Sequence, residues 1–523
     1  MNDTLISRRS RRGAVLIVVL VVVAMLSLAG YTFTHMMLTH QQAAQLHGRQ
    51  VQARVLVDSG VEYVRTYFTQ EEATRQEMGG HYLNPTVFQA VPVMVDADPR
   101  GRGNFSVVAP NLDEMGNLAG VRYGLEDLST RLNMNILPMA EGLLPGAGRT
   151  LLMALPGMTE DTADAILDWI DEDDEVREFG AEAESYEGYM PKNGPLDSVE
   201  ELLLIRGVTP RLLFGLDTNR NGMVEQHELE QEVSGVTSTA QETAAIDVTA
   251  EGMQRGWSGF LTLHSQEKNA TSLGQQRIFV NNDNLQELFQ QLSDVFNEEW
   301  AVFIVAYRQA GAFDGGDSGE SASGHTIDFE QEPQEKLSQV LDLIDKKVQV
   351  RFADEDDSVV LRSPFPNDQA AMNIYLPLLM DVLSVSESPT IPGRININQA
   401  PRSILLGIPG MTEELVETIV EQRTLELDPQ NEDPNLKFES WLLTTGVVDL
   451  DQMKALMPFV TAGGDVFQAQ VVGYFEDGGA ASRTEAIFDT TGKIPRVVFW
   501  RDISHLGRGY PLELLGVQLD VTQ

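Results

Sequence analysis

The sequence predicts an α+β fold, with one long N-terminal helix, a β-sheet and a helical domain that contains an EF-hand-like loop. Three observations lead to this prediction. An unbroken apolar run over residues 14–26 opens a helical pattern. Short apolar runs broken by Gly, Pro and Asn follow over 71–130, as strands joined by turns would require. A helix–turn–helix pattern then occurs twice, which indicates a separate helical region.

The N-terminal segment is typical of a membrane anchor that continues as one helix. Arginines precede the apolar run at positions 8, 9, 11 and 12, so the positive-inside rule puts the rest of the chain across the membrane. Beyond the run, one helix face is apolar, at Ala53, Val57, Val61, Val64 and Phe68. From Ala14 this predicts a helix of roughly 55 residues, about 80 Å long, of which about a third fits in a bilayer. The alternative is a short anchor followed by a separate helix.

The residue between the arginines and the apolar run is Gly13, which resembles the processing site of type IV prepilins and pseudopilins. The resemblance implies that a prepilin peptidase removes residues 1–13 and leaves Ala14 as a methylated N-terminus. Most such proteins have Glu at the fifth mature position, where this chain has Val18. Among pseudopilins, that departure resembles the K-type minor pseudopilin of type II secretion. The alternative is a signal peptide cleaved near Ala29, because residues 27–30 (SLAG) offer a small-residue site.

The composition excludes several classes of site. None of the 523 residues is cysteine, so the chain has no disulfide, zinc–thiolate site or cysteine nucleophile. The net charge of −41 repels polyphosphate backbones and attracts cations. The sequence has no GxSxG, P-loop or HExxH motif, and no carboxylate pair stands out as an acid and a base. We therefore expect a protein that is not an enzyme.

The helix–turn–helix pattern is an internal repeat. Residues 151–169 (LLMALPGMTEDTADAILDW) align with 404–422 (ILLGIPGMTEELVETIVEQ), and LNMN at 132–135 aligns with ININ at 395–398. A Pro-Gly pair forces a turn in each copy, and the Thr after each turn can cap the next helix. The unit resembles the helix-hairpin-helix of SAM-like domains.

Helix-hairpin-helix units commonly bind DNA by directing turn amides at phosphate. In this chain four acidic residues would face the phosphate, namely Glu160, Asp161, Glu413 and Glu414. No stripe of Lys or Arg compensates for them. We therefore expect the repeats to be packing units and expect no nucleic-acid partner.

Residues 217–228 (DTNRNGMVEQHE) match the calcium loop of an EF-hand. The candidate ligands are Asp217, Asn219, Asn221, Met223 through its carbonyl, Glu225 and Glu228. Gly222 fills the sixth position, where the turn needs a positive φ. Only three of these ligands are carboxylates, so we expect modest affinity and a structural role. The alternative is a turn rich in Asp and Asn.

An acidic segment at 168–189 lies between the first repeat and the SVEEL segment at 198–202. Its DWIDEDD run, the Gly-Ala-Glu and Tyr that follow, and SVEEL resemble the general secretion pathway protein K family. ININQAP at 395–401 and the strand-rich tail from Phe467 share this resemblance. The resemblance implies calcium in the acidic loop, with candidate ligands Asp171, Asp173, Asp174, Glu182 and Glu184. The alternative is a solvated acidic loop.

The predicted organisation has seven parts. They are a leader (1–13), a transmembrane and pilin-like long helix (14–70), an α/β pilin-like region (71–135), a helical domain (136–235), an inserted α/β unit (236–390), a second helix-hairpin-helix module (391–462) and a C-terminal β region (463–523). The insert does not resemble the family. There we expect strands at 260–263, 277–280 and 301–307, a helix at 284–297 and a Gly/Ser/Asp-rich loop at 311–325.

The resemblance implies a minor pseudopilin at the tip of the type II secretion pseudopilus, which supports pseudopilus assembly and protein secretion across the outer membrane. The implied partners are I- and J-type minor pseudopilins, other type II secretion components, the prepilin peptidase and the membrane, with calcium as cofactor. The implied location is the bacterial inner membrane, with one span and the main domains in the periplasm. Two alternatives stay open, namely a membrane-anchored helix-hairpin-helix DNA receptor and a signal-bearing secreted calcium-binding protein.

Overall fold

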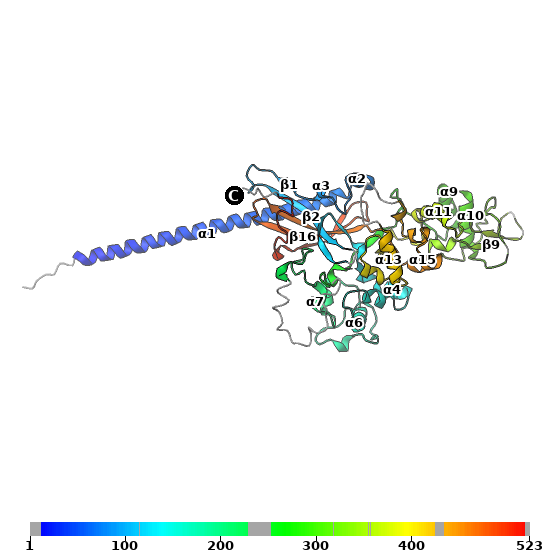
Figure 1. The fold of residues 1–523 in the computed structure, drawn as a ribbon, viewed down its shortest axis with the longest axis horizontal. Coiled ribbons are helices and arrows are strands. Elements are labelled where there is room, and N and C mark those ends of the chain that lie inside the picture. The colour runs from blue at the N-terminus through cyan, green and yellow to red at the C-terminus, as the bar shows by residue number, and fades with distance from the viewer. Residues whose placement is uncertain are drawn as a thin grey trace, which may run out of the picture.

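One helix, α1 (Arg12–Tyr67), forms the N-terminal part of the molecule and projects from the body (Figure 1). The computed structural model describes residues 12–113, 116–228, 253–316, 318–353, 355, 357–423 and 434–517. Within these ranges one helix, Val15–Tyr67, is long and apolar enough to cross a membrane, and none of its most apolar window is buried. The prediction of a single long helix is confirmed, and the alternative of a short anchor with a separate helix is wrong.

The C-terminal part of α1 packs on a seven-stranded antiparallel sheet. The predicted apolar face, from Ala53 to Phe68, is buried there. The main path of the sheet is β1 (Val91–Met94), β2 (Gly103–Leu112), β15 (Val466–Phe475), β16 (Ala481–Asp489) and β17 (Arg496–Asp502). Strand β3 (Leu118–Tyr123) also pairs with β2, and β4 (Glu126–Asp127) pairs with β15. The regions predicted separately at 71–135 and 463–523 are therefore joined in one sheet.

A close helix–strand contact sets the distance between α1 and the sheet. Gly473 in β15 faces the helix, and a Cβ there would lie 2.6 Å from the main-chain oxygen of Ala53. From the helix side, a Cβ on Gly60 would lie 2.5 Å from a methyl carbon of Val471. Both glycines are needed because backbone and side chain approach each other directly here.

Replacing Gly473 with valine is expected to destabilise the packing of α1 on the sheet by about 1–3 kcal/mol, because the added atoms meet helix main chain that cannot turn away. The thermal midpoint by circular dichroism would measure the loss. Gly492, an exposed turn residue in the same sheet region, supplies the control, because a Cβ there meets nothing closer than 3.7 Å. Equal midpoints for the two valine variants would contradict the close contact.

His81 lies beside the same core, with its ring centroid 4.6 Å from that of Phe467 and 6.1 Å from that of Phe68. Burial, followed by the charges of Arg75 and Arg122, lowers the pKa of His81 to about 3. An unfolded chain takes up this proton near about pH 6.5. Stability should therefore fall as the pH drops below that value, by about 1.4 kcal/mol per pH unit for this residue.

Replacing His81 with phenylalanine is expected to remove that acid-sensitive part. Urea midpoints at neutral and at mildly acidic pH would measure it, and the difference between the two should shrink in the variant. His505 is exposed, so its replacement by glutamine is the control and should leave the difference unchanged. An unchanged difference in the His81 variant would mean that the histidine is already protonated in the folded chain.

The two sequence repeats fold as equivalent helix–turn–helix units. The first contains α5 (Ala147–Met153) and α6 (Glu160–Ile170), and the second contains α12 (Arg402–Leu406) and α13 (Glu413–Gln422). The turn glycines have φ values of 69° at Gly157 and 88° at Gly410. The side chains of Thr159 and Thr412 accept hydrogen bonds from the amides three residues later. The predicted Pro-Gly turns and threonine caps are therefore confirmed.

Equivalent ion pairs join the two helices of each unit. Arg149 contacts Asp164 at 2.5 Å in the first unit. Arg402 contacts Glu417 at 2.6 Å in the second, and these residues occupy the corresponding positions of the alignment. The duplication therefore extends from the turns to the polar contacts that orient the helices.

The two units also pack directly on each other. A Cβ on Gly407 would lie 2.6 Å from the Cβ of Ala154, and these two residues are equivalent in the repeats. Equivalent residues of α5 and α12, among them Arg149 and Arg402, line the groove beside this contact. The two repeats therefore pack through equivalent surfaces, the α5 side of the first against the α12 side of the second. The sequence did not predict this arrangement.

Around the repeats lie short elements that close the helical part. They are β5 (Leu132–Asn133), α4 (Leu137–Leu143), α7 (Pro210–Phe214), β13 (Ile395–Asn396), α14 (Trp441–Thr444), α15 (Leu450–Leu456) and β14 (Val460–Thr461). Helices α2 (Glu72–Glu77) and α3 (Pro85–Phe88) precede the sheet. One apolar cluster runs from Leu132 to Val460, so the helical domain, the insert and the second module share a core.

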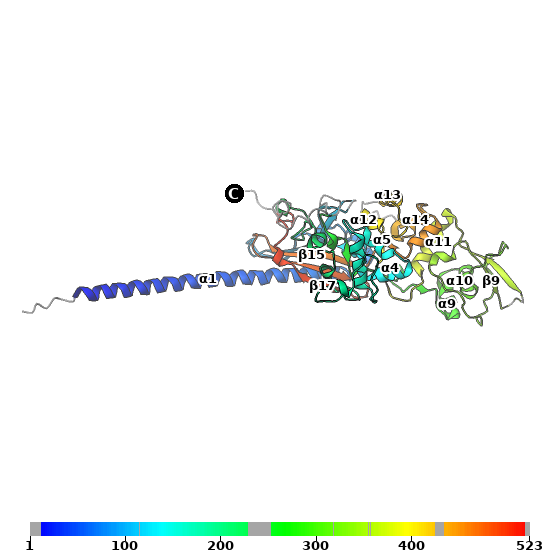
Figure 2. The same ribbon diagram turned by 90° about the horizontal axis from the view of Figure 1, so that it is seen from below.

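The insert is described from Met253 onward and extends to the end of the body opposite the free part of α1 (Figures 1 and 2). Its elements are β6 (Leu261–Thr262), β7 (Gln266–Lys268), β8 (Ile278–Phe279), α9 (Leu285–Val295), α10 (Glu298–Ala310), β9 (Lys347–Arg351), β10 (Ser358–Arg362), α11 (Gln369–Val382), β11 (Leu383–Ser384) and β12 (Thr390–Pro392). The predicted strands at 260–263 and 277–280 and the helix at 284–297 are confirmed in position.

The predicted strand at 301–307 is wrong, because this segment lies inside α10. Asn297 caps the helix by accepting a hydrogen bond from the amide of Trp300, and two glutamates follow in the first turn. Residues 301–306 are completely buried. A helix buried on every side shows no amphipathic period, so its sequence cannot be told from that of a buried strand.

Candidate metal site

The predicted processing site lies at the beginning of α1. The helix begins at Arg12, so the backbone of Gly13 and Ala14 belongs to its first turn. The residues before Arg12, including the other arginines of the basic flank, lie outside the described ranges. The apolar side chains that follow, from Val15 onward, are exposed, so the body of the protein does not cover this part of the helix.

The loop at 217–228 follows α7 and is held together by its own carboxylates. The carboxylate of Asp217 accepts hydrogen bonds from the amides of Asn221 at 3.0 Å and Gly222 at 2.8 Å. Gly222 has the positive φ that the sixth position of a calcium loop requires, 74°. Two of the predicted ligands, Asp217 and Asn221, therefore occur in a tight turn of the expected shape.

Glu228 closes the other end of this loop. Its side chain reaches back to accept hydrogen bonds from the amides of Thr218 and Asn219, and from the amide of Glu225 at 3.0 Å. Glu228 is only 3% exposed. Burial and the nearby charge of Glu228 are among the effects that raise the pKa of Asp217 to about 6. Two neighbouring carboxylates in one loop, one of them buried, disfavour each other's charge, and a bound cation would relieve this.

The remaining predicted ligands lie in the same turn. The amide nitrogen of the Asn219 side chain donates to Glu225 at 3.1 Å, while its Oδ1 atom is buried and has no hydrogen-bond partner in the structure as described. The amide of Met223 donates to the side chain of Asn221 at 2.8 Å. A buried oxygen without a partner is uncommon, and an ion coordinated by oxygen would satisfy it.

In the second predicted site, the acidic loop, an arginine already lies among the carboxylates. Arg177 contacts Asp168 at 2.7 Å and also pairs with Asp171. Asp173 accepts the amide of Glu175, and Asp174 accepts the side chain of Asn193. Glu184 is exposed to solvent. Asp168 and Arg177 were not predicted from the sequence, because they are nine residues apart and meet only when the loop folds.

Glu182 is the unusual residue of the acidic loop. It is 5% exposed, and within the described chain both of its carboxylate oxygens are buried without a hydrogen-bond partner. Burial, followed by the charges of Asp168 and Asp171, raises the pKa of Glu182 to about 7. A buried carboxylate costs free energy unless it is paired, so these oxygens fit a cation.

Neither loop gathers its carboxylates around one point. Within the described ranges, no three acidic or histidine side chains lie close enough together to hold a metal ion. Most of the carboxylates instead contact backbone amides, asparagine side chains or Arg177. The candidate ligands are all oxygen atoms, which suits calcium. Their side chains would have to rotate toward a common point to bind the ion. The two ligand sets therefore stay predictions.

The helical part that carries these loops corresponds to a known family. Residues 130–217 match the family model described as type II secretion system protein K. The match assigns this segment of the chain to the type II secretion protein K family. The matched segment begins just before β5, contains α4 to α7 and the acidic loop, and ends at the first residue of the EF-hand-like loop.

Solved structures also match the chain, among them the following one. It is the crystal structure of the GspK-GspI-GspJ complex from the type 2 secretion system of enterotoxigenic Escherichia coli. The identity is 10%, the match covers 88% of this chain and 99% of that chain, and the TM-score is 0.35. No curated protein sequence matches the chain.

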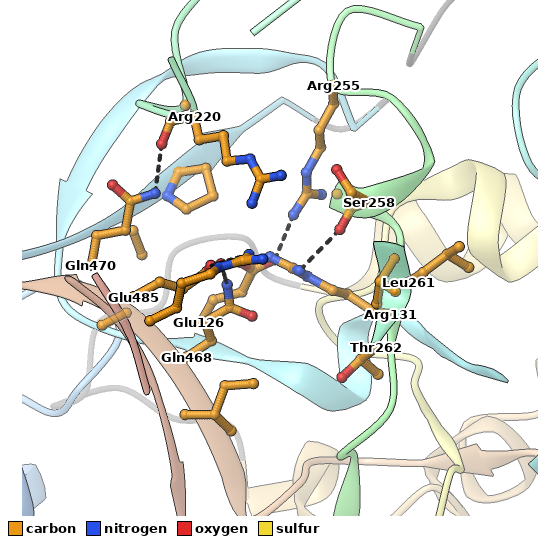
Figure 3. Close-up of a pocket in the computed structure, with 18 of the residues that line it drawn as sticks. Glu126, Arg131, Arg220, Arg255, Ser258, Leu261, Thr262, Gln468, Gln470 and Glu485 are labelled. Atoms are coloured by element: carbon orange, nitrogen blue, oxygen red, sulfur yellow. Dashed lines mark hydrogen bonds and ion pairs between the residues drawn. The ribbon is translucent and has the colours of Figure 1, made fainter. Parts of the chain in front are cut away.

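A buried ion cluster beside the family segment was also missed from the sequence. It borders a cavity of about 150 Å³ between the sheet and the helical domain. Arg255 contacts Glu126 at 2.7 Å, and Arg131 donates to the same carboxylate at 3.0 Å (Figure 3). An arginine precedes each repeated Asn-x-Asn step, and Arg394, the counterpart of Arg131, also lies in a buried ion cluster. The arginine before each repeated step was the sequence feature from which a buried ion cluster could have been predicted.

Proposed function

We infer that the chain is a minor pseudopilin of a type II secretion system. The observation that carries this conclusion is a protein K domain joined in one chain to a long N-terminal helix whose apolar part stands free of the body. A free apolar helix suits both a membrane span and lateral packing in a fibre. The protein's role is to support assembly of the pseudopilus and so protein secretion across the outer membrane.

The N-terminal residues support processing by a prepilin peptidase. We propose that cleavage after Gly13 leaves Ala14 as a methylated N-terminus. The basic flank keeps the leader in the cytoplasm, so the chain spans the inner membrane once and its domains lie in the periplasm.

The placement we propose is the tip of the pseudopilus, beside I- and J-type minor pseudopilins. The Escherichia coli structure holds proteins K, I and J in one complex by its title. Val18 supports the tip, because a buried glutamate at this position would need a partner amine from a subunit above it. A chain with nothing above it has no such partner, and an apolar residue avoids the cost.

We also propose that calcium binds the EF-hand-like loop and the acidic loop as a structural ion. The oxygen donors, the buried Glu182 and the unpartnered Asn219 oxygen support this proposal. Calcium would be held by Asp217, Asn219, Asn221, Met223, Glu225 and Glu228 in one loop, and by Asp171, Asp173, Asp174 and Glu182 in the other, with Glu184 as the outermost candidate. The ion supplies charge compensation and order, and no reaction is assigned to it.

Two other functions remain to be distinguished. A DNA receptor is disfavoured by the net charge and by the acidic residues after each turn. A secreted calcium-binding protein would lose its apolar segment near Ala29. In the pseudopilin that we propose, the helix-hairpin-helix repeats are packing units and bind no DNA.

The mass of the N-terminal peptide after co-expression with a prepilin peptidase tests the proposal. We expect a chain that starts at Ala14 and carries one methyl group. Replacing Gly13 with leucine should abolish this cleavage, whereas replacing Ala29 with leucine should not affect it. Cleavage near residue 30 that is blocked by the Ala29 variant would overturn the pseudopilin and leave the secreted protein.

A further inference from the structure

The EF-hand-like loop is packed against the sheet domain through its inner residues. The side chain of Arg483 in β16 donates to the carbonyl of Asn219, and Gln470 in β15 donates to the carbonyl of Arg220. The side chain of Asn221 donates to the carbonyl of Gly509 at 2.7 Å. Three successive residues of the loop are therefore bonded to two strands and to the C-terminal segment.

Packing around these bonds leaves the loop little space. Asn221 is 1% exposed and Arg483 is fully buried. A Cβ on Gly222 would lie 3.2 Å from Pro110 in β2. Met223 packs on an apolar cluster formed by strands β2 and β15 and by the C-terminal segment. The loop is therefore closely packed against the sheet.

That conformation depends on the residues we propose as calcium ligands. Arg220 and Gly222 have left-handed φ values of 55° and 74°, which direct the carbonyls and Asn221 toward the sheet. Arg220 is not glycine, so its conformation needs support from its surroundings. Asp217 and Glu228 supply it by holding the backbone amides on both sides, yet both are acidic, and Glu228 is buried. Without a cation, their mutual repulsion acts on the turn that meets the sheet.

We propose that the EF-hand-like loop is a calcium-dependent latch that fixes the helical domain on the pilin-like sheet. The proposal rests on the calcium site under Proposed function. Bound calcium holds the turn at 219–223 in the shape that β15, β16 and the segment near Gly509 accept. Without calcium the three bonds loosen, and the helical domain moves relative to the sheet. The chain connections and the ion pair of Arg501 in β17 with Glu200 in the helical domain keep the domains together.

The absence of cysteine makes a direct distance measurement possible in the full chain in detergent micelles. Asp161 on α6 and Lys493 in the β16–β17 turn are exposed and can be replaced by cysteines that carry spin labels. Pulsed electron paramagnetic resonance then gives the distance distribution between the two domains. With calcium chloride we expect a narrow distribution, and with EGTA one that is about twofold wider, as expected when a domain contact opens.

Three variants separate the latch from the calcium site. Glu228→Gln removes a proposed ligand, so the distribution should be wide with or without calcium. Gln470→Ala keeps every proposed ligand but loses the bond to Arg220, so calcium should still bind and the narrowing should shrink. Glu182→Gln lies in the acidic loop and should leave the narrowing intact.

Calcium binding by calorimetry is measured on the same samples. If calcium binds and Glu228→Gln removes that binding, but the distribution stays equally narrow in EGTA, the latch is wrong and the calcium site stands. If no calcium binding depends on Glu228, the proposed calcium site in this loop is wrong, and the latch proposal, which rests on it, is wrong as well. Narrowing that persists unchanged in Gln470→Ala would also overturn the latch.

Discussion

Replacing Glu126 with glutamine is expected to destabilise the folded chain by about 3–5 kcal/mol, as loss of one partner does in buried ion pairs. Glu126 accepts hydrogen bonds from Arg131 and Arg255, and the side chains of all three residues are less than one-tenth exposed. Although burial opposes it, the charges of Arg131 and Arg255 lower the pKa of Glu126 to about 2. A neutral glutamine would leave two buried guanidinium groups facing each other without a counter-charge.

The midpoint of urea unfolding would measure this effect. Glu476→Gln is the matched control, since Glu476 pairs with Arg102 at 3.1 Å and both side chains are partly exposed. That change should cost less than about 1 kcal/mol. The low pKa of Glu126 means that its contribution is present above its ordinary pKa and is lost as the pH falls toward about 2. Similar midpoints for the two variants would show that the buried arginines find other partners.

Removing calcium with EGTA is expected to produce the second large loss of stability. A ligand that binds only the folded chain stabilises it by about 2.7 kcal/mol when its concentration is one hundred times Kd. For a domain of about 150–250 residues this corresponds to a fall of about 5–10 °C in Tm. The physical reason is that EGTA would leave the neighbouring carboxylates of Asp217 and Glu228, and the buried carboxylate of Glu182, without a compensating cation.

Differential scanning calorimetry with and without EGTA checks this prediction. Glu228→Gln should remove most of the calcium dependence that comes from the EF-hand-like loop, and Glu182→Gln should remove the part from the acidic loop. Glu184→Gln changes an exposed carboxylate and is the control. A Tm that does not respond to EGTA in the unsubstituted chain would mean that neither loop binds calcium in the folded protein.

The repeats illustrate how far local pattern can be used. Pro-Gly and the following threonine specify a turn and a cap within a few residues, and the structure has both in each copy. The buried helix face from Ala53 to Phe68 was also predicted, because amphipathic periodicity indicates which side of a helix is buried. By contrast, residues 301–306 of α10 are buried on every side and show no amphipathic periodicity, so this segment was predicted as a strand.

The acidic loop shows the limit for sites. Its carboxylates were visible in the sequence, but Arg177 approaches Asp168 and Asp171 through folding of the loop. Likewise, Glu126 and Arg255 are 129 residues apart and meet only in the folded chain. Ion pairs between distant segments leave no spacing rule in the sequence, so a search for motifs cannot find them.

By itself, then, the sequence determined the features that depend on neighbours along the chain. These are the long helix, the two turns with their caps, the absence of cysteine chemistry and the loop with the spacing of a calcium site. Only the tertiary structure decided that β2 pairs with β15, that the two repeats pack through Gly407 and Ala154, and that the calcium-type loop lies against the sheet. The physical reason is that strand pairing and core packing depend on complementary surfaces from distant segments, and many segments of similar composition could satisfy them.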